Sequence, residues 1–250
     1  MLLECDSISK RFGGVHAVAD IDLAIAPGQV FGLIGPNGAG KRTLVNLISG
    51  HLRVDSGAIR FAGADVTRLP PHALTARGIA RTFQGVRLFK GLTVLENVLV
   101  GGHARMRSDL LRRLWPRGAS DAPDRERAGQ LLERLGLTRP HALAGELAYG
   151  DQRRLEIARA LASDPRLLIL DEPAAGMNPA ESARLRGLMR GLVAEGLTIV
   201  LIEHDVRLVM GTCERVAVLN FGRKIAEGTP IEIQASPVVR EAYLGTEEVA

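Results

Sequence analysis

The chain has 250 residues, enough for one large domain or for one domain with an inserted subdomain. Apolar residues make up 46% of the chain, and no apolar run approaches the ~18 residues of a membrane span. Two cysteines do not predict a disulfide framework, and the first residues do not have the pattern of a signal peptide. The net charge of +4 and the aromatic content of 4% argue against a nucleic-acid partner.

The first half of the chain alternates between strand and helix patterns. Residues 3–9 and 21–25 alternate apolar and polar side chains, which predicts half-buried antiparallel strands. The apolar run 30–34 predicts a buried strand, and the helical spacing in 41–48 predicts a helix directly after it. A further strand is expected at residues 56–61.

The second half predicts a parallel sheet. Residues 166–170 and 197–202 are continuous apolar runs, as expected of central parallel strands buried on both faces, and a helix is expected between them at 180–194. Residues 216–219 and 224–227 predict a hairpin that turns at 221–223. Together these elements predict an α/β core with an antiparallel edge.

The middle of the chain has a different character. Residues 93–159 are mainly helical in pattern, with a break at 115–123, and predict a helical subdomain inserted in one domain that spans 1–250 and ends in a tail at 236–250. The stretch 103–117 is rich in arginine. Either a solvated loop or a contact with a membrane partner or lipid head groups explains it.

A glycine-rich loop follows the predicted strand at 30–34. It departs in one position from the phosphate-binding pattern Gly-x-x-x-x-Gly-Lys-Ser/Thr. Glycines allow successive backbone N–H groups to converge on phosphate oxygens, the following helix contributes its positive end, and lysine reaches the terminal phosphates. The predicted nucleotide-binding residues are Gly35, Pro36, Asn37, Gly38, Ala39, Gly40, Lys41, Arg42 and Thr43.

Two carboxylates follow the buried run 166–170. Asp171 is predicted to hold Mg²⁺ through the water shell of the ion, and Glu172 to orient and activate the attacking water. Alone, Asp-Glu-Pro is a common turn at a strand end. In a chain that also carries a phosphate loop, the pair indicates nucleotide hydrolysis.

The segment Leu-Ala-Tyr-Gly-Asp-Gln-Arg-Arg-Leu-Glu-Ile-Ala-Arg that starts at residue 147 completes a set of motifs. With it, the chain resembles the nucleotide-binding subunits of ABC transporters, which have a P-loop NTPase core and an inserted helical subdomain. The form of this segment resembles the branch that serves branched-chain amino acid uptake. So do residues 78–84, 92–97, 174–179, 228–230 and 241–245.

The resemblance implies roles for single residues. Phe12 would stack on adenine, with a core phenylalanine as the alternative, and Gln84 would touch Mg²⁺ and the attacking water, with an ordinary strand-end glutamine as the alternative. Glu172 matches the catalytic carboxylate, and His204 matches the histidine that contacts the γ-phosphate. Asn178 lies in the loop through which two subunits communicate.

The resemblance also implies partners. Two ATPase subunits, identical or different, would face each other head to tail, so that the signature of one completes the ATP site of the other. The residues that would serve the partner's ATP are Leu147, Ala148, Tyr149, Gly150, Asp151 and Gln152. Transmembrane permease subunits would hold the pair at the cytoplasmic face of the membrane, and a solute-binding protein would act indirectly.

Arg42 stands where the phosphate-loop pattern has the hydroxyl ligand of Mg²⁺. An arginine has only donors and cannot bind the ion, and the side chain of Thr43 points about 100° away. ATP binding then survives while hydrolysis falls about 10²-fold. Alternatively, Arg42 swings to solvent and water fills the coordination position, or the sequence has been altered. Two functions therefore remain open for the chain: an ATPase subunit, or a nucleotide-dependent clamp with little turnover.

Overall fold

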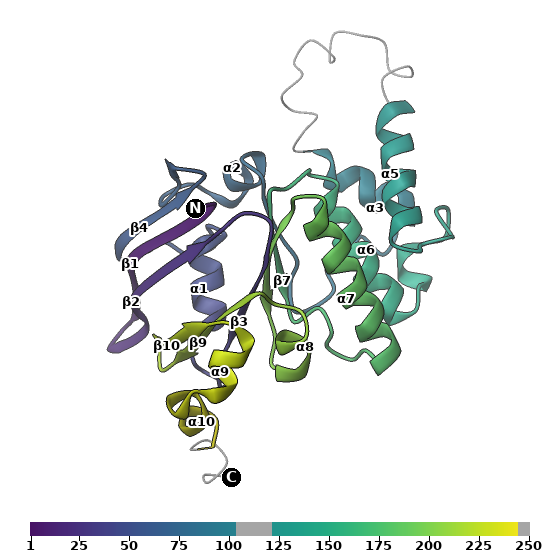
Figure 1. Cartoon of the computed structure of the whole chain (residues 1–250). Helices are drawn as coiled ribbons and strands as arrows, with labels where there is room; N and C mark the ends of the chain where they lie inside the picture. The colour runs from purple at the N-terminus through teal and green to yellow at the C-terminus, as the bar shows by residue number, and fades with distance from the viewer. Residues whose placement is uncertain (104–121, 245–250) are drawn as a thin grey trace.

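The computed structural model describes residues 1–103 and 122–244 and contains two sheets (Figure 1). The first sheet is antiparallel, in the order β2-β1-β4-β5. The second has the order β10-β9-β3-β8-β7-β6, with β10 antiparallel at one edge and the other strands parallel. The strands are β1 (Leu3–Phe12), β2 (Val15–Ile25), β3 (Val30–Ile34), β4 (Ser56–Phe61), β5 (Ala64–Asp65), β6 (Ile79–Arg81), β7 (Leu167–Asp171), β8 (Thr198–Ile202), β9 (Arg215–Asn220) and β10 (Arg223–Gly228).

The central strands are buried on both faces. Every residue of β3, β7 and β8 is buried, which explains why these segments are continuous apolar runs rather than alternating ones. Two apolar clusters fill the two sides of the sheet. Because the carboxyl ends of parallel strands lie at one edge, the loops that follow β3, β7 and β8 meet there.

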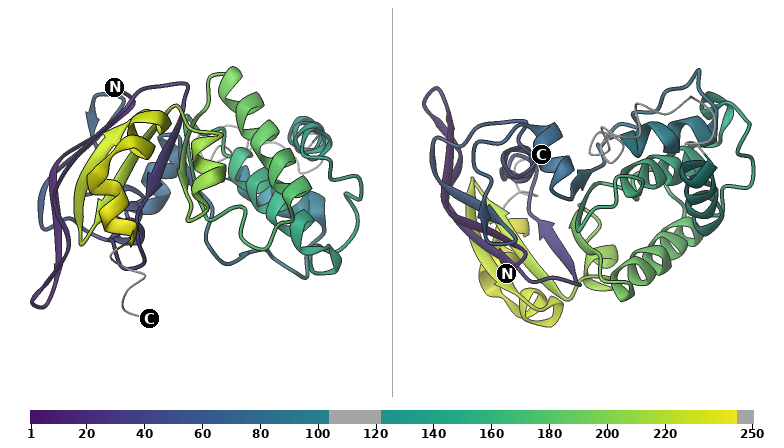
Figure 2. Two further views of the ribbon diagram at one scale, coloured as in Figure 1. Left: turned by 60° about the horizontal axis from the view of Figure 1, so that its bottom comes forward. Right: turned by 90° about the horizontal axis from the view of Figure 1, so that it is seen from above.

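Helices cover both faces of the parallel sheet and form a separate layer beyond it. Helices α3, α5, α6 and α7 gather on the side away from the antiparallel sheet (Figure 2). The helices are α1 (Lys41–Ile48), α2 (Pro71–Ala76), α3 (Val94–Gly101), α5 (Ala122–Arg134), α6 (Tyr149–Leu161), α7 (Pro179–Ala194), α8 (Val206–Met210), α9 (Pro230–Ala235) and α10 (Pro237–Leu244), with a 3₁₀ turn at Ala144–Glu146.

Local sequence signals explain where several helices begin. Thr93 starts α3 with a capping box to Glu96, and Thr229 starts α9 in the same way with Glu232. Asn178 caps α7, because its side chain accepts a hydrogen bond from the backbone N–H of Glu181 at 2.9 Å. Each of these caps satisfies backbone donors that the helix cannot satisfy itself.

The predicted α/β core is confirmed, and several boundaries differ from the expectation. The first strand continues to Phe12, and the second already begins at Val15, so the two are joined by a tight turn. The predicted break in the helical pattern at 115–123 is wrong for its last two residues, because Ala122 and Pro123 belong to the first turn of α5. Proline is compatible with a helix in the first turn. The rest of this break, and residues 104–117 of the basic stretch, lie outside the described residues.

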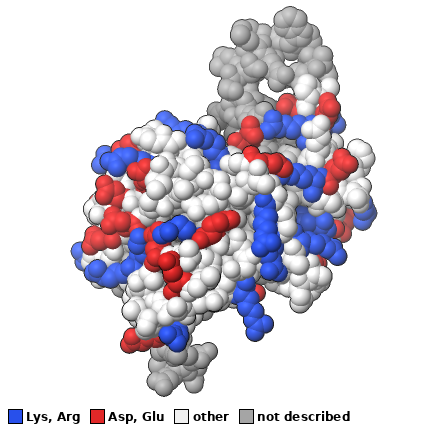
Figure 3. Space-filling model, viewed as in Figure 1, with Lys and Arg blue, Asp and Glu red and all other residues white. Residues whose placement is uncertain are grey.

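The described surface mixes both signs of charge. On the face drawn in Figure 3, acidic and basic side chains are interspersed, and a run of basic side chains follows the helical layer. None of the helices in the described ranges combines the length and apolar character needed to span a membrane.

Candidate nucleotide-binding site

The loop after β3 is closely packed against two strands. Gly35 and Gly40 have φ values of 149° and 99°. A Cβ atom on Gly35 would lie 2.1 Å from the carbonyl oxygen of Leu219, and one on Gly40 would lie 2.4 Å from that of Ala17. Only glycine fits these two positions. A Cβ atom on Gly38 would meet nothing within 4 Å, which leaves the middle of the loop open.

The loop surrounds the ammonium group of Lys41. This group donates hydrogen bonds to the carbonyl oxygens of Gly35 at 2.5 Å and Pro36 at 2.9 Å. Burial lowers the pKa of Lys41, and the nearby carboxylates of Glu172 and Asp171 oppose that shift. No side chain caps the start of α1, and no acidic residue lies in its first turn. The N–H groups at this helix end are therefore available to an anion.

A cleft of about 600 Å³ opens beside this loop. It brings together predicted residues that are far apart in the chain: the loop from Asn37 to Thr43, Gln84, Asp171 and Glu172. Thr43 belongs to this lining, although a hydroxyl at that position was expected to point away from the magnesium position. The lining is completed by Val15, His16, Ala17, Ile202 and Phe221.

Arg42 points into this cleft. Its Nη2 atom donates a hydrogen bond to Oε1 of Gln84, and Nε2 of Gln84 donates one to Oε2 of Glu172 at 2.7 Å. Three side chains from α1, from the loop after β6 and from the residue after β7 thus form one hydrogen-bonded chain.

The backbone at Glu172 is held in an unusual conformation. Its φ is 48°, in the left-handed region that side chains rarely adopt, and its N–H donates to the carbonyl oxygen of Ile202 at 2.9 Å. Strained backbone of this kind clusters at functional sites, where the surrounding structure enforces it. In this conformation the Glu172 side chain lines the cleft and accepts the hydrogen bond from Gln84.

Asp171 is paired with an arginine that the motifs did not identify. Nη2 of Arg81 lies 2.9 Å from Oδ2 of Asp171, and both side chains are only 6% exposed. Nη1 of Arg81 also donates to Asn46 at 2.6 Å and to Ser49 at 2.9 Å. Burial lowers the pKa of Arg81, but a guanidinium group keeps its charge in proteins. A charged residue at the end of an apolar strand is the signal that could have revealed this pair.

The donor set around the cleft does not fit Mg²⁺ in the way the resemblance implies. Arg42 offers only N–H donors, Oε1 of Gln84 accepts from Arg42, and Oδ2 of Asp171 accepts from Arg81. Mg²⁺ requires near-octahedral coordination by oxygen atoms. Within residues 1–103 and 122–244, no cluster of three or more His, Cys, Asp or Glu side chains is arranged to hold a metal ion.

A buried ion pair on α6 holds the loop that carries Gln84. Arg153 donates to the carbonyl oxygens of Phe83, at 2.9 Å, and of Gln84. Oε1 of Glu156 accepts from the backbone N–H groups of Phe83 at 3.5 Å and Arg87 at 3.3 Å. The Arg153 and Glu156 side chains lie 3.5 Å apart and are 4% and 2% exposed. Burial raises the pKa of Glu156, and the loop N–H group of Arg87 and the charge of Arg153 oppose this.

The signature segment lies at the start of the same helix. Ala148 is the N-cap of α6 and makes no side-chain cap, while the hydroxyl of Tyr149 accepts a hydrogen bond from Nε of Arg153 at 3.0 Å. None of the residues from Leu147 to Gln152 lines the cleft of the phosphate loop. Gly150 lines a different cavity, together with Met177 and Glu181.

His204 follows β8 and is exposed. Its side chain is 66% accessible, it does not belong to the lining of the cleft, and its Nδ1 atom lies 3.8 Å from Oε2 of Glu203. Glu203 is 1% exposed and accepts a hydrogen bond from the N–H of Ala174 at 2.9 Å. Burial raises the pKa of Glu203. The contact to Ala174 ties the end of β8 to the turn that follows Glu172.

The Glu203→Gln substitution is expected to stabilise the protein increasingly as the pH rises. A carboxyl group with a raised pKa in the folded state contributes stability that is complete below its ordinary pKa of 4.5 and lost as the pH rises through the folded pKa. Glutamine still accepts from Ala174 but buries no charge at high pH. The difference in Tm between variant and wild-type protein should therefore grow from pH 5 to pH 8, and a constant difference would contradict the assignment.

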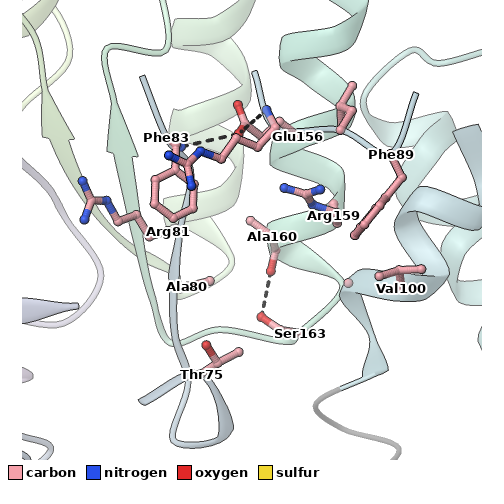
Figure 4. A pocket seen from close by; sticks show the side chains of 13 residues that line it. Thr75, Ala80, Arg81, Phe83, Phe89, Val100, Glu156, Arg159, Ala160 and Ser163 are labelled. Atoms are coloured by element: carbon pink, nitrogen blue, oxygen red, sulfur yellow. Dashed lines mark hydrogen bonds between the residues drawn. The ribbon is translucent and has the colours of Figure 1, made fainter. Parts of the chain in front are cut away.

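A second cleft, of about 500 Å³, lies on the other side of the Gln84 loop. Figure 4 shows Phe83, Glu156, Arg159 and Phe89 around it. Arginine side chains stack on both rings: the guanidinium carbon of Arg87 lies 4.4 Å from the centroid of Phe83, and that of Arg159 lies 5.7 Å from the centroid of Phe89. This cleft combines an apolar floor with several cations and one buried carboxylate.

Two exposed phenylalanines lie near the nucleotide cleft. Phe12 is 49% exposed at the end of β1 and pairs with Val15, which lines the cleft, although Phe12 itself does not. The core alternative for Phe12 is therefore wrong. Phe221, in the turn between β9 and β10, is 83% exposed and does line the cleft. The motifs did not point to Phe221, because nothing in its local pattern distinguishes it from a turn residue.

Comparison with known proteins identifies the family. The ABC transporter family profile matches residues 18–175, and one described as branched-chain amino acid ATP-binding cassette transporter matches 223–249. The high-affinity branched-chain amino acid transport ATP-binding proteins BraF of Pseudomonas aeruginosa and LivG of Escherichia coli K12 are each 44% identical, over 98% of this chain and 98% of their own.

Solved structures agree with this result. The ADP conformation of an ATP-binding cassette of an ABC transporter has a TM-score of 0.86 and 34% identity, and covers 98% of both chains. A bacterial ABC transporter cassette solved as a dimer has a TM-score of 0.78 and 26% identity, and covers 91% of this chain and 98% of its own. The predicted family and its P-loop NTPase fold are confirmed. The chain belongs to the ABC transporter family, as one of its ATP-binding cassettes.

Proposed function

We propose that the chain is the ATP-hydrolysing subunit of an importer for branched-chain or related hydrophobic amino acids. The observation that carries the proposal is the cleft in which the phosphate loop, Gln84, Asp171 and Glu172 face one another. The substrate class is supported by the 44% identity to BraF and LivG over nearly the whole chain, and by the C-terminal match at residues 223–249.

The residues of the cleft divide the work of nucleotide hydrolysis. The open N–H groups of the phosphate loop, the start of α1 and the Lys41 ammonium bind the phosphates. Glu172, positioned by Nε2 of Gln84, orients a water molecule toward the γ-phosphorus and accepts its proton. The new oxygen–phosphorus bond forms as the bond to the β-phosphate oxygen breaks, which leaves ADP and inorganic phosphate. His204 contacts the γ-phosphate once nucleotide is bound.

Arg42 weakens the coordination of Mg²⁺ at this site. Its side chain, directly after Lys41, has no oxygen that could bind the ion. Its guanidinium group donates a hydrogen bond to the acceptor oxygen of Gln84, which the resemblance assigns to the ion. Hydrolysis at this site is therefore slow.

The same hydrogen-bonded chain favours the second candidate function, a nucleotide-dependent clamp with little turnover. Against a pure clamp stand Glu172 and His204, which such a protein does not need.

The signature segment serves a second subunit. Residues 147–152 lie outside the cleft of their own phosphate loop, and the start of α6 offers backbone N–H groups that no side chain caps. A head-to-tail pair, identical or different, would place this helix end on the partner's ATP, with Asn178 in the loop between the two subunits. The dimeric cassette structure supports this assembly.

The permease subunits dock at the second cleft. Phe83, which precedes Gln84 in the same loop, lines this cleft (Figure 4). A permease segment seated there would move Gln84 relative to Glu172. The buried pair Arg153 and Glu156 would transmit that movement to the signature helix, because it bonds the backbone of the same loop. This docking would hold the chain at the cytoplasmic face of the membrane, with a solute-binding protein acting through the permeases.

Genetic complementation tests the proposed function. Expressed in Escherichia coli that lacks LivG, the chain or its Arg42→Thr variant should restore uptake of radiolabelled leucine at limiting concentration. The Glu172→Gln variant is the matched control and should restore none. If neither the chain nor its Arg42→Thr variant restores uptake although both co-purify with the permease subunits, the substrate class is wrong.

The Phe12→Ala substitution is expected to weaken ATP binding about tenfold. Stacking of a base on an aromatic ring contributes ~1–3 kcal/mol, and Phe12 is exposed beside the strand residue that lines the cleft. Equilibrium binding of ATP to the purified chain measures the effect. Phe89→Ala, which removes a similarly exposed ring from the other cleft, is the control. Equal affinities of all three proteins would exclude stacking on Phe12.

A further inference from the structure

We infer that this site binds a nucleoside triphosphate without its divalent cation, with the Arg42 guanidinium in place of the metal charge. The inference rests on the proposed function only in that the phosphate loop must bind nucleotide. It concerns the chemical form of the ligand: the free triphosphate rather than its magnesium complex.

The position of Arg42 is the first argument. Arg42 is the second residue of α1, follows Lys41 directly and lines the cleft of the phosphate loop. Its guanidinium group bonds Oε1 of Gln84, the oxygen that the resemblance assigns to the metal. A permanent cation therefore already joins the start of α1 to Gln84, the residue that the resemblance assigns to the metal.

The balance of charge around the cleft is the second argument. Lys41, Arg42 and Arg81 contribute three positive charges, while Asp171 and Glu172 contribute two negative ones. The carboxylate that would attract a cation, Asp171, is neutralised by Arg81 at 2.9 Å. The net charge of these five groups is thus 3 − 2 = +1. Before nucleotide binds, the site therefore attracts an anionic ligand and repels a free cation.

The chemistry of guanidinium is the third argument. Its planar fork of N–H donors matches phosphate oxygens and can hold two of them at once, which a lysine ammonium cannot do. It reproduces the charge of the metal but not its octahedral oxygen geometry. Such a site retains the triphosphate and gives little help to its cleavage, so tight binding and slow turnover have one cause.

Equilibrium binding with and without magnesium tests the inference. The fluorescent analogue mant-ATP is titrated into the purified full chain, once with excess Mg²⁺ and once with excess EDTA. For the wild-type protein, Kd should change by less than about threefold. For Arg42→Thr, removal of Mg²⁺ should weaken binding by about 10-fold or more, because the hydroxyl restores a metal ligand and the charge-assisted contact is gone.

Two further variants keep the test decisive. Arg68→Thr removes an exposed arginine outside the cleft and should behave as wild type. Arg42→Lys keeps the charge and should remain insensitive to EDTA, which provides a second comparison if Arg42→Thr does not fold. Wild-type binding that is lost in EDTA overturns the inference and leaves the proposed function intact. Wild-type protein that binds no nucleotide under either condition overturns the proposed function instead.

Discussion

Arg42→Thr is expected to raise Mg²⁺-dependent ATP hydrolysis about 100-fold. The substitution restores a hydroxyl oxygen at the position where the phosphate-loop pattern supplies a metal ligand, and it frees Oε1 of Gln84. A single electrostatic contact of this kind is worth ~10²–10³ in kcat. Release of inorganic phosphate from purified protein with Mg²⁺ and ATP measures the change.

Arg42→Lys separates the two parts of this effect. The lysine side chain is shorter and does not hold Oε1 of Gln84 as the guanidinium group does, but it supplies no oxygen to the metal. Hydrolysis should therefore stay near the wild-type rate. If the wild-type chain hydrolyses Mg-ATP at an ordinary rate of ~1–10³ s⁻¹ and Arg42→Thr does not exceed it, the weak-site account is wrong.

Arg153→Met is expected to destabilise the fold by about 3–5 kcal/mol. The substitution removes the cation that lies 3.5 Å from the buried carboxylate of Glu156, and it removes the donors for the carbonyl oxygens of Phe83 and Gln84. For a domain of this size that loss corresponds to a fall in Tm of ~10 °C. Urea denaturation followed by circular dichroism measures it.

A neighbouring arginine on the same helix provides the control. Arg154 is 31% exposed and bonds Asp151 and the carbonyl oxygen of Leu135, so Arg154→Met should cost no more than about 1 kcal/mol.

The double variant Arg153→Met, Glu156→Leu replaces the pair by apolar groups and should recover much of the stability. Because the loop loses its anchor, this variant should hydrolyse ATP without stimulation by the permease. An Arg153→Met protein as stable as wild type would contradict the role of the pair.

Local patterns in the sequence predicted the framework of the site. The phosphate loop and the buried strands before it and before Asp171 each depend on residues close together in the chain. Periodicity and glycine placement specify such elements because the physical cause is local. Parallel pairing then brings the strand ends to one edge, which is why separate motifs meet in one cleft.

The contacts that define this particular site could not be predicted in that way. Arg81 and Asp171 are 90 positions apart, and Arg42 and Gln84 are 42 apart. Their pairing depends on side-chain directions that only the assembled sheet determines. For Arg42 the sequence left solvent, a guanidinium in the site and an altered sequence as explanations, and the hydrogen bond to Gln84 is the contact expected of the second.

A crystal structure with a non-hydrolysable ATP analogue and Mn²⁺ tests the central claim most directly. Mn²⁺ scatters anomalously and takes the same oxygen ligands as Mg²⁺. The account predicts no anomalous peak at the β- and γ-phosphates, with the Arg42 guanidinium group bonded to their oxygens. An anomalous peak there, coordinated by Gln84 with Arg42 turned away, would contradict it.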